Sequence, residues 1–222
     1  MVSLRAYLAA GGLTSCLLAV DASAVLDAWF ATQRNVHALS AEFIQTRALK
    51  ALTRPLTTPG HLWFQAPGNF RWELGRPAQT IALRSGSDLY VIYPALQRAE
   101  HYPLGAAAPA EWRDAMSLLS AGFPRNRAEF ESQFRVLSLT QTNGLWRLAL
   151  EPNSRFARQM MPELRIGLAT NDFSMAFNEM IFVDGSSMRN DFTNAVLNPT
   201  LDTKLFQWKP PPDYTVMEPL SK

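Results

Sequence analysis

The chain has 222 residues, of which 47% are hydrophobic and 18% are charged. This length suits one large domain or two small ones, and the composition is ordinary for a globular protein. The net charge is +2, and no run of lysine or arginine occurs. The charge pattern therefore excludes a nucleic-acid partner and gives no sign of a basic membrane-binding patch.

The N-terminus has the features of an export signal. Arg5 supplies a positive start, residues 6–20 form an apolar stretch, and Ala22-Ser23-Ala24 is a small-x-small cleavage site. Cleavage there makes residues 1–24 a signal peptide and leaves 222 − 24 = 198 residues, 25–222. The apolar stretch is too short and too rich in glycine for a good membrane span.

Cys16 leaves an alternative open. Leu13 to Cys16, "LTSC", resembles the lipobox of bacterial lipoproteins, in which the cysteine becomes a lipidated first residue. Apolar "LLAV" follows it, where such proteins usually carry a polar tether, so signal cleavage is favoured. Cys16 is the only cysteine, so a chain beginning at Val25 has no disulfide and no thiol chemistry.

The first half of the chain predicts one helix followed by strands. Residues 25–40 place Leu26, Trp29, Phe30 and Val36 near one helical face. After them the hydrophobic period changes to two, with Pro, Gly and Ser-Gly turns between short segments rich in β-branched and aromatic residues. The predicted strands are 40–50, 60–64, 69–74, 79–84, 88–93 and 98–104.

A second helix interrupts this succession. Residues 109–122 begin with Pro and end with Gly, and Trp112, Met116 and Leu119 form an apolar stripe. Residues 124–133 predict a short helical turn. Strands follow at 134–140, 145–152, 161–169, 175–184 and 187–198, before a C-terminal segment at 205–216.

About eleven strands and two main helices, with no linker between them, favour one domain. Sequential hairpins predict an antiparallel sheet that curves toward a barrel. Each helix has a single apolar stripe, which is typical of a helix that packs on a sheet face or closes the mouth of an open barrel. An incomplete barrel covered in this way would enclose an apolar space.

The sequence shows no pattern typical of catalysis or metal binding. The three histidines, His37, His61 and His101, match no metal-ligand spacing, and none pairs with a cysteine. No nucleophile elbow, P-loop or dinucleotide fingerprint occurs, and the acidic residues are scattered. We therefore expect no catalytic residues, no metal and no enzymatic activity.

Five segments together resemble the LolA family of periplasmic lipoprotein carriers. "GHLWFQAPGNFRWEL" (60–74) is similar to the family's most characteristic segment, and "LSAEFIQT" (39–46) resembles its early strand, with Phe43 and Gln45. Residues 83–98 resemble the next strand-turn-strand. Residues 181–194 and 206–216 resemble the penultimate hairpin and the C-terminal ending, so the resemblance covers nearly the whole chain after the signal.

The resemblance implies a mainly β fold with helices, an unclosed antiparallel barrel of about eleven strands under a helical lid. It also implies a monomeric carrier without cofactor in the periplasm of a Gram-negative bacterium. Such a carrier takes acylated lipoprotein from an inner-membrane exporter to an outer-membrane acceptor. Two alternatives stay open: a lipid-sensing regulatory domain like RseB, and a lipidated acceptor like LolB, which requires Cys16 as first residue.

Aromatic residues of the characteristic segment are the candidate cavity wall. Trp63, Phe70 and Trp72 are the predicted lipid-binding residues, and Phe70 and Trp72 share strand parity. The predicted lid contacts are Trp29, Trp112, Met116 and Leu119. The alternative for both groups is plain core packing. Arg71, between the aromatics, is expected on the outer face.

Two positions depart from the family pattern. The family's arginine just before the proline, which is implicated in lid closure and release, is Ala66 here, and an aspartate before the turn glycine is Ser85. The missing arginine favours a LolA-related paralogue with a different lipid cargo.

Overall fold

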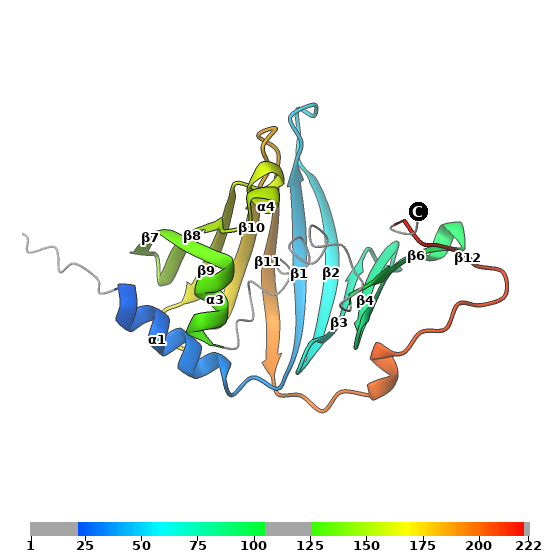
Figure 1. Ribbon diagram of the computed structural model, residues 1–222, viewed down its shortest axis with the longest axis horizontal. Coiled ribbons are helices and arrows are strands. Elements are labelled where there is room, and N and C mark those ends of the chain that lie inside the picture. Colours follow the sequence, from blue (N-terminus) through cyan, green and yellow to red (C-terminus); the bar gives the residue numbers. More distant parts are fainter. Residues whose placement is uncertain (1–21, 105–125, 220–222) are drawn as a thin grey trace, which may run out of the picture.

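The computed structural model describes residues 22–104 and 126–219, which form one curved sheet with short helices beside it (Figure 1). No helix within these ranges is both long and apolar enough to span a membrane. The helices are α1 (Ala22–Gln33), η1 (Pro94–Leu96), α3 (Arg127–Gln133), α4 (Arg155–Met160) and η3 (Thr203–Phe206). The strands are β1 (Ala38–Ala48), β2 (Leu56–Gln65), β3 (Asn69–Leu74), β4 (Thr80–Ser85), β5 (Asp88–Tyr93), β6 (Arg98–Pro103), β7 (Phe134–Thr142), β8 (Leu145–Pro152), β9 (Glu163–Ala169), β10 (Met175–Ile181), β11 (Ser187–Leu197) and β12 (Thr215–Met217).

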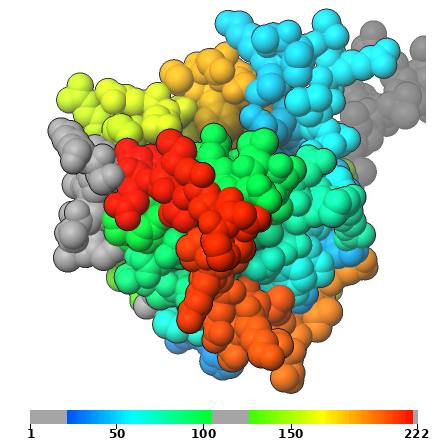
Figure 2. Space-filling model, turned by 90° about the vertical axis from the view of Figure 1, so that its right-hand side faces the viewer, coloured from blue at the N-terminus to red at the C-terminus, as the bar shows by residue number. Residues whose placement is uncertain are grey.

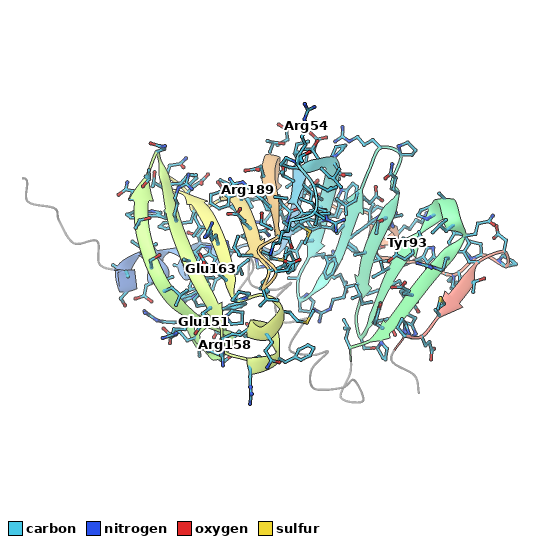
Figure 3. The ribbon with its side chains drawn as sticks, turned by 90° about the horizontal axis from the view of Figure 1, so that it is seen from above. Arg54, Tyr93, Glu151, Arg158, Glu163 and Arg189 are labelled. Carbon is cyan, nitrogen blue, oxygen red and sulfur yellow. The ribbon has the colours of Figure 1, made fainter. Side chains whose placement is uncertain are left out.

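The described strands form one unclosed sheet in the order β12-β6-β5-β4-β3-β2-β1-β11-β10-β9-β8-β7. Every neighbouring pair is antiparallel except β12 and β6, which are parallel. Seen from above, the sheet forms an arch (Figure 3). The predicted fold class is confirmed, with β12 as an additional parallel strand at one edge.

The first helix is shorter than the sequence predicts. It ends at Gln33, and β1 begins at Ala38, whereas periodicity extends the helix to Ser40. Asn198 explains the difference: its Oδ1 accepts hydrogen bonds from the backbone N–H groups of His37 (2.7 Å) and Ala38 (3.1 Å). Its Nδ2 also donates to the carbonyl of Asn35 (2.9 Å). A residue about 160 positions away therefore fixes where the chain leaves the helix.

Two other helical segments bear on the predictions. Residues 155–160 form α4, which the sequence analysis missed, with Ser154 as N-cap accepting a hydrogen bond from the Ala157 N–H (3.3 Å). The predicted turn at 124–133 corresponds to α3, capped by Asn126. The predicted helix at 109–122 lies outside the described residues.

The main core lies on the concave face of β7–β10. Figure 1 shows α1 and α3 in front of these strands. Trp29 and Phe30 of α1 stack at 5.3 Å, and Phe130 of α3 meets the Trp29 ring edge-on at 5.6 Å. Beneath them lie buried side chains of the strands: Leu148, Leu150, Leu164, Ile166 and Leu168. The helices thus cover one half of the arch.

The C-terminal segment covers the convex face of the other half. Trp208 contacts Tyr90 (5.2 Å between ring centroids) and Tyr214 (5.8 Å), over a cluster that includes buried Leu83 and Ile92. Figure 2 shows this segment lying across β4–β6. These aromatic contacts bring the chain to the edge where β12 pairs with β6.

Candidate functional site

The concave face of β11, β1, β2 and β3 carries an apolar aromatic wall. Its centre is the buried Phe43, whose ring lies 4.2 Å from Trp72 and 5.9 Å from Phe192. Trp72 also meets Phe192 edge-on at 6.1 Å. The other members are Leu39, Leu62, Phe64, Phe70 and Leu74. We call this set of eight residues the aromatic wall.

Strand register explains why these side chains meet. Phe43 pairs with Phe192 on β11 and with Gly60 on β2, while Trp72 pairs with Leu62. Directly paired residues point to the same face, so the aromatics of three strands share one surface. Gly60 makes this possible, because a Cβ at that position would overlap the Phe43 ring.

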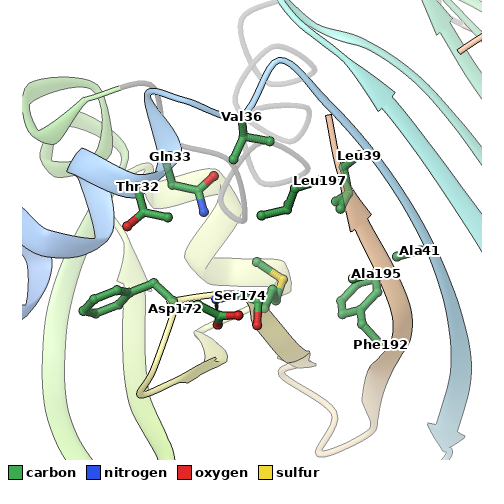
Figure 4. A pocket seen from close by; sticks show the side chains of 12 residues that line it. Thr32, Gln33, Val36, Leu39, Ala41, Asp172, Ser174, Phe192, Ala195 and Leu197 are labelled. Atoms are coloured by element: carbon green, nitrogen blue, oxygen red, sulfur yellow. Dashed lines mark hydrogen bonds between the residues drawn. The ribbon is translucent and has the colours of Figure 1, made fainter. Parts of the chain in front are cut away.

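A small pocket adjoins the wall where α1 ends. It has a volume of about 40 Å³ and lies between the end of α1, the β9–β10 turn and the last residues of β11 (Figure 4). Its lining residues are Thr32, Gln33, Val36, Leu39, Ala41, Asp172, Phe173, Ser174, Met175, Phe192, Ala195 and Leu197. Leu39 and Phe192 belong to the aromatic wall as well, so the pocket continues that apolar surface.

A row of amides borders the wall on the same face. Gln45 Nε2 donates to Asn190 Oδ1 (3.0 Å), and Asn190 Nδ2 donates to Asn178 Oδ1 (2.7 Å). Gln45 and Asn190 are buried. Their positions two residues from Phe43 and Phe192 put them on the concave face, where each amide needs a partner. The row links β1, β11 and β10, and its amides serve as hydrogen-bond partners for one another.

The structure brings two of the three predicted wall residues together. Phe70 and Trp72 lie in the aromatic wall, as their shared parity predicts. Trp63 pairs with Arg71 and Ser40 and therefore lies on the convex face, where it stacks on His61 at 3.8 Å. Arg71 is on the convex face as expected, with its Nε donating to Glu73 Oε1 (2.6 Å).

The predicted lid residues fall in two places. Trp29 of α1 is fully buried in the core between this helix and the sheet, and its ring contacts Phe30 and Phe130. Trp112, Met116 and Leu119 lie outside the described residues. Leu39, Phe43 and Phe192 were not among the predicted wall residues. Alternation along β1 predicts that Leu39 and Phe43 share one face of the strand. Nothing in the sequence near Phe192 predicts that it lies beside them.

Ala66 lies in the exposed turn between β2 and β3. Its backbone N–H donates to the carbonyl of His37 (2.9 Å), which ties this turn to the connection between α1 and β1. A side chain at position 66 is thus located at the end of the sheet where α1 ends and the pocket lies.

Charged groups near Trp63 lie on the convex face. Burial is the main reason that the pKa of the His61 imidazole lies below its ordinary value, and Nε2 of the ring hydrogen-bonds Ser40 Oγ at 2.8 Å. The pKa of the exposed Glu42 carboxyl is lowered, first by a hydrogen bond from Asn194 and then by one from Arg76. Within the described residues, no group of three or more His, Cys, Asp or Glu side chains could hold a metal ion.

An unclosed antiparallel sheet with helices over part of an apolar concave face defines the class of half-barrel proteins. The sequence model of the family described as "Outer membrane lipoprotein carrier protein LolA" matches residues 34–209. The chain therefore belongs to the LolA family, as the sequence resemblance predicts.

Individual relatives agree with the family assignment. The chain is 25% identical over 185 residues to an outer-membrane lipoprotein carrier protein of Bordetella avium, covering 83% of this chain and 82% of the relative. It is 26% identical over 184 residues to one from Methylococcus capsulatus, covering 83% of each. A crystal structure of an uncharacterized conserved protein from Thermus thermophilus has a TM-score of 0.51 at 9% identity, covering 89% of this chain and 98% of that one. This last likeness concerns the fold alone.

Proposed function

We propose that this protein is a periplasmic carrier that binds acyl chains of lipoproteins, or of another lipid, and moves them from the inner to the outer membrane. The observation that carries this proposal is the aromatic wall, an apolar surface on the concave side of an unclosed sheet. Each CH₂ group removed from water is stabilised by about 0.8 kcal/mol, so such a wall can hold an acyl chain without a charged contact.

Loading requires the apolar surface to open. The pocket beside the wall, at about 40 Å³, is far below the roughly 300–1,000 Å³ of ordinary ligand sites. Thr32 of α1, Val36 just after this helix and Leu197 at the end of β11 all line the pocket (Figure 4). We propose that the end of α1 and the end of β11 separate when cargo enters, which exposes Leu39 and Phe192.

The proposed function requires two partners and no chemical step. Relatives named outer-membrane lipoprotein carrier proteins support a lipoprotein as cargo. The proposal adds an inner-membrane exporter that delivers this cargo and an outer-membrane acceptor that receives it. Binding to the wall and release from it need no catalysis and no cofactor, and we propose that one copy of the chain carries out both.

A displacement experiment tests the proposal. Delipidated, folded protein is titrated with an apolar fluorescent probe, which should bind saturably and be displaced by a long-chain lipid. Trp72→Glu should weaken binding about tenfold or more, because it places an unpaired carboxylate in the wall. Trp63→Glu is the matched control, since Trp63 lies on the convex face and its replacement should leave affinity unchanged.

Two results would contradict the carrier function. One is the absence of saturable binding by the folded wild-type protein, which would make the aromatic wall plain core. The other is an equal loss of affinity in both tryptophan variants, which would show that the concave face is not the site. Mass spectrometry of lipids that copurify with the native protein would identify the cargo.

A further inference from the structure

Three segments at one end of the sheet carry exposed apolar side chains. They are the β1–β2 loop with its flanks (47–56), α4 with its flanks (153–162) and the β10–β11 turn (182–187), and we call them together the upper rim. Figure 1 shows these segments at the top of the molecule. Val183 is 71% exposed and Met160 is 52% exposed. The other exposed apolar side chains of the rim are Leu52, Leu56 and Phe156.

The three segments are joined to one another. The N–H of Val183 donates to the carbonyl of Met160 (3.1 Å), which links the β10–β11 turn to the end of α4. Ala48 pairs with Ser187, which places the β1–β2 loop beside the same turn. Lys50 also lowers the pKa of the Asp184 carboxyl through its charge, in addition to larger effects of hydrogen bonds from Ser186. The apolar side chains thus belong to one end surface.

The upper rim is strongly cationic. It contains five positive residues, Arg47, Lys50, Arg54, Arg155 and Arg158, against one carboxylate, Asp184. The whole chain has 21 basic and 19 acidic residues, so this balance is local to the rim. Figure 3, seen from above, shows Arg54 and Arg158 on this end of the molecule.

Nearby carboxylates do not cancel this charge. Asp184 accepts hydrogen bonds from the N–H and the hydroxyl of Ser186 (2.9 and 2.6 Å) within its own turn. The flanking Glu151 and Glu163 are ion-paired with Arg135 (2.6 Å) and Arg165 (2.7 Å). The positive residues of the rim are therefore in excess beside its exposed apolar side chains.

We propose that the upper rim docks the protein on the surface of a lipid bilayer that carries anionic phospholipid headgroups. Exposed apolar groups that lie among cations suit the boundary between headgroups and acyl chains. There the apolar groups insert between the acyl chains, and the cations meet the phosphates. The rim has exposed apolar side chains on three separate segments, an arrangement that suits shallow insertion into a bilayer. Docking at this end concerns the membrane surface alone and does not depend on the proposed cargo.

Vesicle cosedimentation tests the docking surface. The full protein is mixed at low salt with vesicles of phosphatidylcholine, or with vesicles in which phosphatidylglycerol replaces part of it. We expect binding to the anionic vesicles only, and weaker binding as salt is added. Replacing Lys50 and Arg54 by Gln should reduce the partition coefficient about fivefold for each charge removed. Arg34→Gln is the matched control and should bind as the wild type does; this exposed residue directly follows α1, whose end lies at the opposite end of the sheet (Figure 1).

An apolar pair tests the insertion itself. Val183→Asp should reduce vesicle binding about tenfold or more, because a carboxylate would enter the headgroup boundary. Val196→Asp, at a 53% exposed valine near the far end of β11, should have no effect. Far-ultraviolet circular dichroism and binding of the acyl probe show that each variant is folded, and both should be unchanged.

Three outcomes would overturn docking on lipid. They are no binding of the wild type to anionic vesicles, equal binding by rim variants and controls, and binding that appears only when membrane proteins are present in the vesicles. The last result would assign the rim to a protein partner. Loss of probe binding with intact vesicle binding would instead contradict the carrier function and leave the docking surface standing.

Discussion

Asn190 is the central member of the amide row that crosses three strands. Its Oδ1 accepts a hydrogen bond from Gln45 and its Nδ2 donates one to Asn178. We expect Asn190→Ala to lower the free energy of unfolding by about 1–3 kcal/mol, because a buried donor and an acceptor lose their partner. Urea unfolding measures this. Asn178→Ala, which breaks a single bond at the end of the row, should cost less; an equal or larger loss would show that the row does not act through Asn190.

His61 makes stability depend on pH between neutral and mildly acidic conditions. Its folded-state pKa is lowered, mainly by burial, below the ordinary value of 6.5. The unfolded chain then binds more protons, so this group's contribution is present above about pH 6.5 and is lost as the pH falls through the folded pKa. The wild type should therefore lose unfolding free energy as the pH falls below about 6.5.

His61→Gln isolates that contribution. Glutamine retains a polar group near Ser40 Oγ but does not titrate, so the slope of unfolding free energy against pH should become shallower. Above about pH 5.5 the lowered pKa of Glu42 keeps its carboxylate charged, so it does not contribute to the slope there. An unchanged slope in the variant would assign the pH dependence to other groups.

The β1–β2 pair depends on the absence of a side chain at Gly60. A Cβ there would overlap the ring of Phe43, which lies directly over this glycine. We expect Gly60→Ala to destabilise the protein by about 1–3 kcal/mol and to disturb the aromatic wall. Thermal unfolding and near-ultraviolet circular dichroism measure both effects. Gly86 has open space around its Cβ position and serves as control, with the strain of its positive φ as its own smaller cost of about 1 kcal/mol.

Elements with a local signal were predicted well. Turns at Asn143-Gly144 and Asp184-Gly185 have positive φ at their glycines, and the strands on either side lie where alternation places them. Predictions failed where residues distant in the sequence determine the structure. The end of α1 depends on Asn198, and the contact of Phe43 with Phe192 depends on β11 lying beside β1. Periodicity within one segment carries no information about which other segment pairs with it.

Ala66 bears on the proposed carrier function of the whole molecule. Alanine offers no side-chain donor at the turn that is tied to His37, so the closure that we propose for the carrier would rest on apolar contacts, which are non-directional. We expect that the unmodified protein will not rescue a strain depleted of its own LolA carrier. Ala66→Arg alone should not fully restore rescue, because the groups that would bond the new arginine must match as well.

The rescue is measured by expressing the unmodified protein or the Ala66→Arg variant from a plasmid in the depleted strain. Immunoblotting of periplasmic fractions is the control, since both forms must be present at equal levels. Full rescue by the unmodified protein would contradict a specialised cargo and assign the protein to general lipoprotein transport.

The sequence by itself determined the strand and turn pattern, the mainly β class and the LolA family, because these depend on local periodicity and on motifs read along the chain. Only the tertiary structure decided which face each strand presents. Trp63 and Trp72 are close in sequence, yet the β2–β3 register pairs Trp63 with Arg71 and places the two tryptophans on opposite faces. The upper rim likewise exists only through the tertiary structure. Its basic residues form no run in the sequence. They share one surface because the long-range pairing of β1 with β11 brings the β1–β2 loop beside the β10–β11 turn, to which α4 is hydrogen-bonded.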